Sequence, residues 1–150
     1  LDKIYRLKKR LSGVSPGEIN LEFKTALLDA LKDDLNISEA LAKIDEMVNI
    51  ANTNLDKEPK NKALKADIMA NLEFIKEILG VLYIDEFEWF QYGFNDEQKE
   101  QIANLINDRN IAKAAKDYTK ADLIRDELTA LGVAIMDTPN GVKWEKIWTE

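Results

Sequence analysis

The first eighty residues contain four segments in which apolar side chains recur every three or four residues, as they do along one side of an amphipathic helix. Residues with helix-capping side chains precede two of the segments: Ser15, which is followed by Pro16 and Glu18, and Asn36. Gly80 can take the left-handed conformation that ends the fourth segment. The predicted helices cover residues 1–12, 16–34, 37–51 and 62–79, with a polar loop over 52–62. Four such helices joined by short connections predict an antiparallel bundle.

The pattern changes after residue 95. Two further helical segments are expected, one from the capping residue Asn95 and one capped by Thr119, with a break near residues 117–118. Alternation of apolar and polar residues then predicts strands over 133–136 and 142–148, joined by the turn sequence Asp-Thr-Pro-Asn-Gly. The fold class is therefore mainly α: an antiparallel helical bundle domain over residues 1–92, then a small α+β domain of two helices and a β-hairpin over 95–150.

Charge and composition exclude several functions. The net charge is -7 and the pI is near 4.8, so any binding of nucleic acid must depend on local cations rather than on bulk charge. The sequence has no cysteine and no histidine, which excludes a Cys/His zinc site and a Cys or His nucleophile or base. Asp33 and Asp34 are adjacent on a helix and point about 100° apart, so we interpret them as capping and solvent-facing groups, not as a metal pair. No apolar run is long enough to span a membrane and no signal peptide is present, so a soluble, cytoplasmic chain is expected.

Two other groups of residues have alternative interpretations. The cations of the first helix, among them Lys3, Lys8 and Arg10, are either a solvated face or contacts to RNA phosphates. The aromatic side chains of residues 81–94 are either a hydrophobic joint next to the bundle or a platform on which bases stack, and the first is favoured because almost no cations accompany the rings.

The last fifty residues contain the side chains that an unpaired RNA loop requires, namely cations for phosphates, acceptors for base edges and flat rings for stacking. Arg109, Lys113 and Lys116 would share an exposed helix face if that helix were unbroken, and Arg125 adds a fourth cation. The candidate acceptors are Asp122 and Asp137, and the candidate stacking rings are Tyr118 and Trp144. Structural alternatives remain open: Trp144 as a core residue, Arg125 in a surface ion pair, and Asp137 as a side chain that holds the turn.

The stretch from Arg109 to Trp144 resembles the carboxy-terminal segment of bacterial cysteinyl-tRNA synthetases. It reads Arg-Asn-Ile-Ala-Lys-Ala-Ala-Lys-Asp-Tyr-Thr-Lys-Ala-Asp-Leu-Ile-Arg-Asp-Glu-Leu and, further on, Leu-Gly-Val-Ala-Ile-Met-Asp-Thr-Pro-Asn-Gly-Val-Lys-Trp. Residues 23–41 also resemble the helical-bundle domain of that family. The resemblance implies that the family's anticodon-contacting Arg, Trp, Asp and turn Asp correspond to Lys113, Tyr118, Asp122 and Asp137. Lysine lacks the two-pronged donor of arginine, tyrosine has a smaller ring than tryptophan, and Glu145 stands where the family usually has Arg.

The resemblance also implies what this chain lacks. The family's catalytic domain uses a His-Ile-Gly-His motif, a Lys-Met-Ser-Lys-Ser loop, ATP and a zinc ion, and these motifs do not occur here. The expected function is recognition of the tRNA(Cys) anticodon loop by a monomeric enzyme whose catalytic site, with its ATP and zinc, is outside this chain. A helical protein-interaction module and a fragment of a related small-molecule cysteine ligase are the alternatives. Neither would require the hairpin and anticodon-binding residues that this sequence retains.

Overall fold

The computed structural model describes residues 1–147, so Trp148, at the end of the predicted second strand, lies outside the described residues. The chain forms two compact units, Leu1–Glu86 and a second unit from Phe87 onward. The division into functional domains of residues 1–92 and 95–150 stays a prediction.

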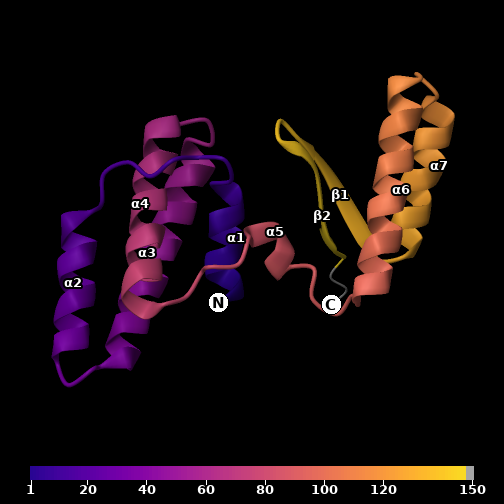
Figure 1. The fold of residues 1–150 in the computed structure, drawn as a ribbon. Helices are drawn as coiled ribbons and strands as arrows, with labels where there is room; N and C mark the ends of the chain where they lie inside the picture. The colour runs from indigo at the N-terminus through magenta and orange to yellow at the C-terminus, as the bar shows by residue number, and fades with distance from the viewer. Residues whose placement is uncertain (148–150) are drawn as a thin grey trace. The chain divides into compact units, whose positions relative to one another are not determined.

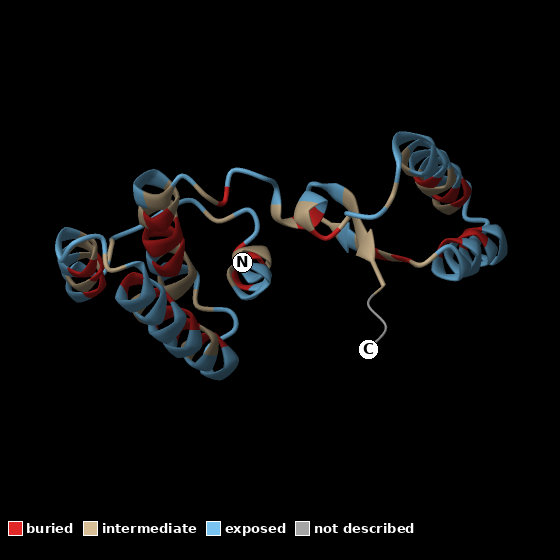
Figure 2. Cartoon of the chain, turned by 90° about the horizontal axis from the view of Figure 1, so that it is seen from below, coloured by how far each residue is buried: buried red, intermediate tan, exposed pale blue. Residues whose placement is uncertain are grey.

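The first unit is a bundle of four helices, as the spacing of apolar residues predicted (Figure 1). Buried residues lie on the sides of the helices that face one another, while residues on the outer faces are exposed (Figure 2). Leu27 of the second helix, Val48 of the third and Ile75 of the fourth are fully buried. The helices are α1 (Asp2–Arg10), α2 (Leu21–Lys32), α3 (Ile37–Lys57) and α4 (Lys62–Leu79).

The start of α2 differs from the prediction. Asn20, not Ser15, is the N-cap, and its side chain accepts a hydrogen bond from the backbone N–H of Phe23. The chain before it is not helical because α4 takes up its donors: the N–H of Gly17 donates to the carbonyl of Ala66 at 2.8 Å, and the N–H of Asn20 donates to the buried side chain of Asn71 at 3.0 Å. Hydrogen bonds to α4 therefore replace the predicted first turn.

The cations of α1 connect it to neighbouring segments. Lys3 pairs with Asp45 of α3 at 2.6 Å, and Arg10 contacts Asp56 of α3 at 2.8 Å. Lys8 donates to the carbonyl of Ile84 at 2.9 Å. These contacts give three of the α1 cations structural partners within the first unit.

The loop before α4 is shorter than predicted. Helix α3 continues to Lys57 because Leu55 extends its buried face beyond Ala51. Asn61 caps α4, and Gly80 ends it with φ of 66°, in the left-handed conformation that the sequence indicated.

We expect Gly80→Ala to lower the unfolding free energy of the first unit by about 1 kcal/mol, because an L side chain is strained in the left-handed region. Gly80→Asn is the matched variant and should cost less, since asparagine tolerates this conformation. Urea unfolding followed by helical circular dichroism measures both. Equal stability of the alanine variant and the parent chain would contradict this explanation of the helix end.

The second unit contains two helices and a hairpin, as predicted, and residues 87–94 pack beside them. Helix α5 (Glu86–Trp89) is one turn long and begins at the last residue of the first unit. Phe87 and Phe90 are buried, and the carbonyl of Phe90 accepts a hydrogen bond from the N–H of Lys146 at 2.9 Å. The remaining elements are α6 (Asp96–Ala114), α7 (Tyr118–Ala130), β1 (Val133–Thr138) and β2 (Gly141–Lys146).

Asp117, not Thr119, caps α7. Its side chain accepts a hydrogen bond from the N–H of Lys120, so the helix begins two residues earlier than predicted. As a result, Tyr118 is the first residue of the helix.

Candidate nucleic-acid interface

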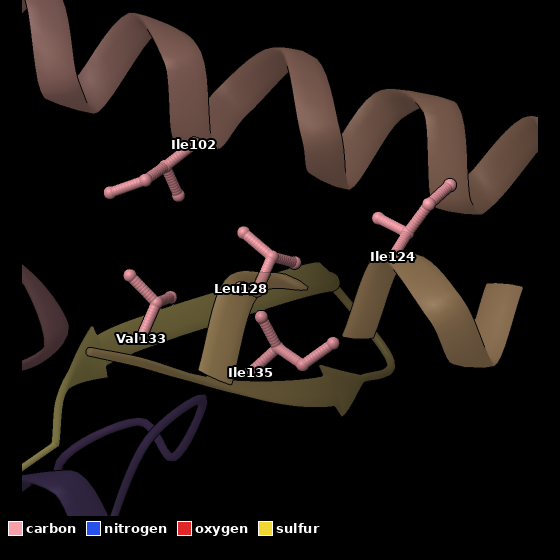
Figure 3. Packing of buried hydrophobic residues seen from close by; sticks show 5 residues of the cluster. All are labelled: Ile102, Ile124, Leu128, Val133 and Ile135. Atoms are coloured by element: carbon pink, nitrogen blue, oxygen red, sulfur yellow. The ribbon is translucent and has the colours of Figure 1, made fainter. Parts of the chain in front are cut away.

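A small apolar core holds the elements that carry the predicted RNA-binding residues. Ile102 of α6, Ile124 and Leu128 of α7, and Val133 and Ile135 of β1 form this core (Figure 3). The side chains of all three elements point toward one another, so the hairpin and the two helices form a single packed unit. Rigid elements of this kind position functional side chains better than free loops do.

Trp144 belongs to the edge of this core. It is paired with Ile135 across the hairpin, and its ring meets the ring of Phe94 edge to face, with 5.4 Å between centroids. The side chain of Gln91 donates to the carbonyl of Trp144 at 2.9 Å. These contacts favour the core interpretation of Trp144 over the stacking one.

Arg109 and Asp137 form a two-pronged ion pair at the end of the core. Nη1 and Nη2 of Arg109 donate to Oδ1 and Oδ2 of Asp137, each at 3.1 Å. Lys113, one turn further along α6, donates to Oδ2 at 3.3 Å. The Arg109 side chain is only 5% exposed, whereas that of Asp137 is 50% exposed. The carboxylate is therefore held from the protein side and reaches solvent on the other.

The periodicity of the sequence accounts for this pair. Asp137 is two and four residues beyond Ile135 and Val133, so it lies on the core-facing side of β1. Arg109 is three residues before the buried Ala112 and seven after the buried Ile102, which is the buried side of α6. Arg109 is therefore not on the exposed face that its spacing from Lys116 suggested. In both α6 and β1, a charged residue occupies a position where the periodicity calls for an apolar one. This was the signal for the pair, and the sequence-based prediction missed it.

The pKa of Asp137 is lowered from its ordinary 3.8 to about 2, chiefly by the hydrogen bonds from Arg109; burial opposes this shift, and the hydrogen bond from Lys113 adds to it. A carboxyl with a lowered folded-state pKa contributes stability above its unfolded pKa and loses that contribution as the pH falls through the folded value. We therefore expect the stability difference between the parent chain and Asp137→Asn to shrink between pH 5 and pH 2. Urea unfolding over this range measures it, and parallel stability curves would contradict the pair.

The hairpin turn does not use the Asp137 side chain as the sequence allowed. Thr138 Oγ1 donates to the carbonyl of Gly141 at 2.6 Å and accepts from the N–H of Asn140 at 3.3 Å. Asp137 is a paired residue of β1, opposite Val142. Thr138 therefore holds the turn, and the Asp137 carboxylate contacts α6.

Three of the predicted residues share one face of α7. Tyr118, Asp122 and Arg125 follow one another at steps of four and three residues, and all are exposed. The Tyr118 side chain is 60% exposed at the first position of the helix. Lys116 is exposed in the connection before it, with φ of 58°. The structure thus presents a ring, an acceptor and two cations at the α6–α7 connection and the adjoining face of α7.

The first unit offers a different surface. An open cavity of about 550 Å³ lies among α2, α3 and α4. Its charged lining consists of one lysine, Lys43, and the carboxylates Glu18, Glu22, Glu46 and Asp67. This excess of negative charge disfavours phosphate there.

Two further features concern metal binding and membrane-spanning helices. Within residues 1–147, no three His, Cys, Asp or Glu side chains come together as a possible metal site. No helix in this part of the chain is long and apolar enough to cross a membrane.

Known protein families match segments in both units of the chain. Residues 95–144 match the cysteinyl-tRNA ligase anticodon binding domain, and residues 26–83 match the DALR domain. The chain is similar to curated cysteine–tRNA ligases: 58% identical to that of Campylobacter fetus and 50% to that of Aliarcobacter butzleri, each over 98% of the chain, and 49% to that of Helicobacter pylori over 99%. The aligned part is 32% of each relative.

The chain therefore belongs to the cysteine–tRNA ligase family and carries its anticodon-binding and DALR domains. It spans about a third of the length of these relatives.

Proposed function

We propose that this chain is the tRNA-recognition part of a cysteine–tRNA ligase and that its second unit binds the anticodon loop of tRNA(Cys). The observation that carries the proposal is the match of residues 95–144 to the anticodon binding domain. The exposed groups around the start of α7 support it, because an unpaired loop is recognised by stacking, by base-edge hydrogen bonds and by phosphate contacts.

Each side chain of this face has a separate proposed role. The ring of Tyr118 stacks on one base, and the carboxylate of Asp122 accepts a hydrogen bond from a base amine or a guanine edge. Lys116 and Arg125 meet phosphates. All four are exposed, so none needs to give up a buried contact before it meets RNA.

Asp137 has a proposed role as an acceptor whose position α6 fixes. Its carboxylate is bound by Arg109 and Lys113 and is still half exposed, so one edge can accept from a base. Arg109 then acts as a positioning residue, because it is buried and meets RNA only through Asp137. Lys113 is less buried and can contact both Asp137 and a phosphate. Trp144 supports the hairpin from the core side.

The complete enzyme in this proposal attaches cysteine to tRNA(Cys) with ATP. That chemistry belongs to the part of the ligase outside this chain, which we propose holds the ATP site and the zinc ion, since this sequence has no histidine or cysteine to supply catalytic or metal-binding groups of that kind. We propose that the enzyme acts as a monomer in the cytoplasm.

The chain should bind a tRNA(Cys) anticodon stem-loop with a shallow salt dependence. Each neutralised phosphate changes the slope of log K against log salt by about -0.7 to -0.9. Lys113, Lys116 and Arg125 are the cations proposed to meet phosphates, so the expected slope is about -2 to -3. Fluorescence anisotropy of a labelled stem-loop at several salt concentrations measures the slope.

A stem-loop of the same length with the anticodon of another amino acid is the control for this titration. We expect weaker binding of the control, because the base-edge contacts of Asp122 and Asp137 are lost. Equal binding of the two loops with a slope near zero would contradict anticodon recognition and favour a protein-interaction module.

A further inference from the structure

The turn between α2 and α3 carries three exposed apolar side chains, which we call the apolar corner: Leu35, Ile37 and Leu41. Their exposed fractions are 69%, 49% and 53%. The corner lies where the carboxyl end of α2 meets the start of α3, at the lower end of the bundle in Figure 1. Single exposed apolar residues are ordinary on protein surfaces, whereas a group of them is a candidate interaction site.

The backbone at the corner is strained. Asp34 and Leu35 have φ of 49° and 55°, so two consecutive residues other than glycine are in the left-handed region. Hydrogen bonds hold the chain there: the N–H of Asn36 donates to the carbonyl of Ala30 at 3.1 Å, and the Asn36 side chain caps α3. Strain of this kind persists where the surrounding structure enforces it and is concentrated at functional sites. Here it holds the Leu35 side chain in solvent.

The charges around the corner indicate what can bind it. Asp33, Asp34 and Glu39 are exposed carboxylates, and Lys32 is the exposed cation among them. A surface with this excess of negative charge repels the phosphates of RNA. The partner is therefore a protein surface, with an apolar centre and polar margins.

We infer that the apolar corner docks on the two-thirds of the ligase that is outside this chain. The curated relatives are about three times as long as the part that this chain matches, so in such a ligase most of the polypeptide is available to cover the corner. Interfaces between domains of one polypeptide cover about 600–1,500 Å² and are more polar than obligate interfaces, and the corner would supply the apolar centre of one. The inference rests on the proposal that this chain is part of a complete ligase. It does not depend on how the second unit binds RNA.

Photo-crosslinking in the complete ligase tests the docking. The photoreactive residue p-benzoylphenylalanine is introduced in the variant Leu35→p-benzoylphenylalanine, and crosslinked peptides are identified by mass spectrometry. Leu21, the first residue of α2, is the matched control because it is 70% exposed in the same unit. We expect Leu35 to crosslink to peptides of the same polypeptide outside these 150 residues, in at least fivefold higher yield than Leu21.

Crosslinks from Leu35 to a second copy of the ligase or to tRNA would overturn the inference, as would a yield no higher than that of Leu21. Hydrogen exchange provides an independent measurement. In the complete ligase, Leu35→Asp should speed exchange about tenfold or more at the crosslinked surface, whereas Leu21→Asp should leave it unchanged. Unchanged exchange in Leu35→Asp would also overturn the docking.

The same variants separate this inference from the proposed function. Leu35→Asp should bind the tRNA(Cys) stem-loop as the parent ligase does, because the corner is in the first unit and the proposed RNA face is in the second. Loss of stem-loop binding in Leu35→Asp would contradict the docking role. Failure of the parent ligase to discriminate between stem-loops would instead contradict the proposed function and leave the crosslinking result to stand by itself.

Discussion

Asp137→Ala should lower the unfolding free energy of the second unit by about 2 to 3 kcal/mol. The substitution leaves the guanidinium of Arg109, with its side chain 5% exposed, without the carboxylate that accepts both of its hydrogen bonds. Arg109→Met should cost less, about 1 kcal/mol, because the half-exposed carboxylate can hydrate and keeps Lys113. Urea unfolding followed by tryptophan fluorescence reports on this unit, since Trp89, Trp144 and Trp148 all follow Glu86 in the sequence.

Asp122→Ala is the matched control, because Asp122 is an exposed carboxylate of the same unit. It should change the stability by no more than about 0.5 kcal/mol. If Asp137→Ala were as mild as this control, or milder than Arg109→Met, the burial of Arg109 would not determine the energetics of the pair.

Tyr118→Ala should weaken binding of the tRNA(Cys) stem-loop by about 1 to 3 kcal/mol, the contribution of a base that stacks on an aromatic ring. This corresponds to a loss of affinity of roughly 5- to 150-fold. The stability should barely change, because the side chain is 60% exposed at the first position of α7. Anisotropy titration and urea unfolding of the same variant measure the two effects.

Two substitutions control for effects other than stacking. Tyr118→Phe keeps the ring and should retain most of the affinity. Leu123→Ala removes a side chain that is 65% exposed elsewhere on α7 and should leave the affinity unchanged. Normal binding by Tyr118→Ala would remove this residue from the proposed site.

The arrangement of helices could be predicted from the sequence because most of it follows from local periodicity and capping. Asn36, Asn61 and Asn95 each accept a hydrogen bond from a backbone N–H three residues on, and Gly80 ends α4 as its position indicated. The start of α2 could not be predicted from local signals. Ser15 and Pro16 favour a helix, but hydrogen bonds to a helix some fifty residues away determine the conformation there.

The exposure of part of the candidate site could be predicted from the sequence, but the contacts within the site could not. Tyr118, Asp122 and Arg125 are exposed as expected, because a single helix places them. The contact between Arg109 and Asp137 joins residues 28 positions apart, and no local pattern specifies it. The prediction treated Arg109 as a surface cation, since arginine is seldom buried unless it has a partner.

The pair between Arg109 and Asp137 also fixes the register of the hairpin. A slip of β1 by one residue would turn Val133 and Ile135 away from the core and move the carboxylate to the opposite face of the strand. The hairpin would then lose apolar contacts and a two-pronged ion pair together. Misregistered forms are consequently disfavoured by two different kinds of interaction.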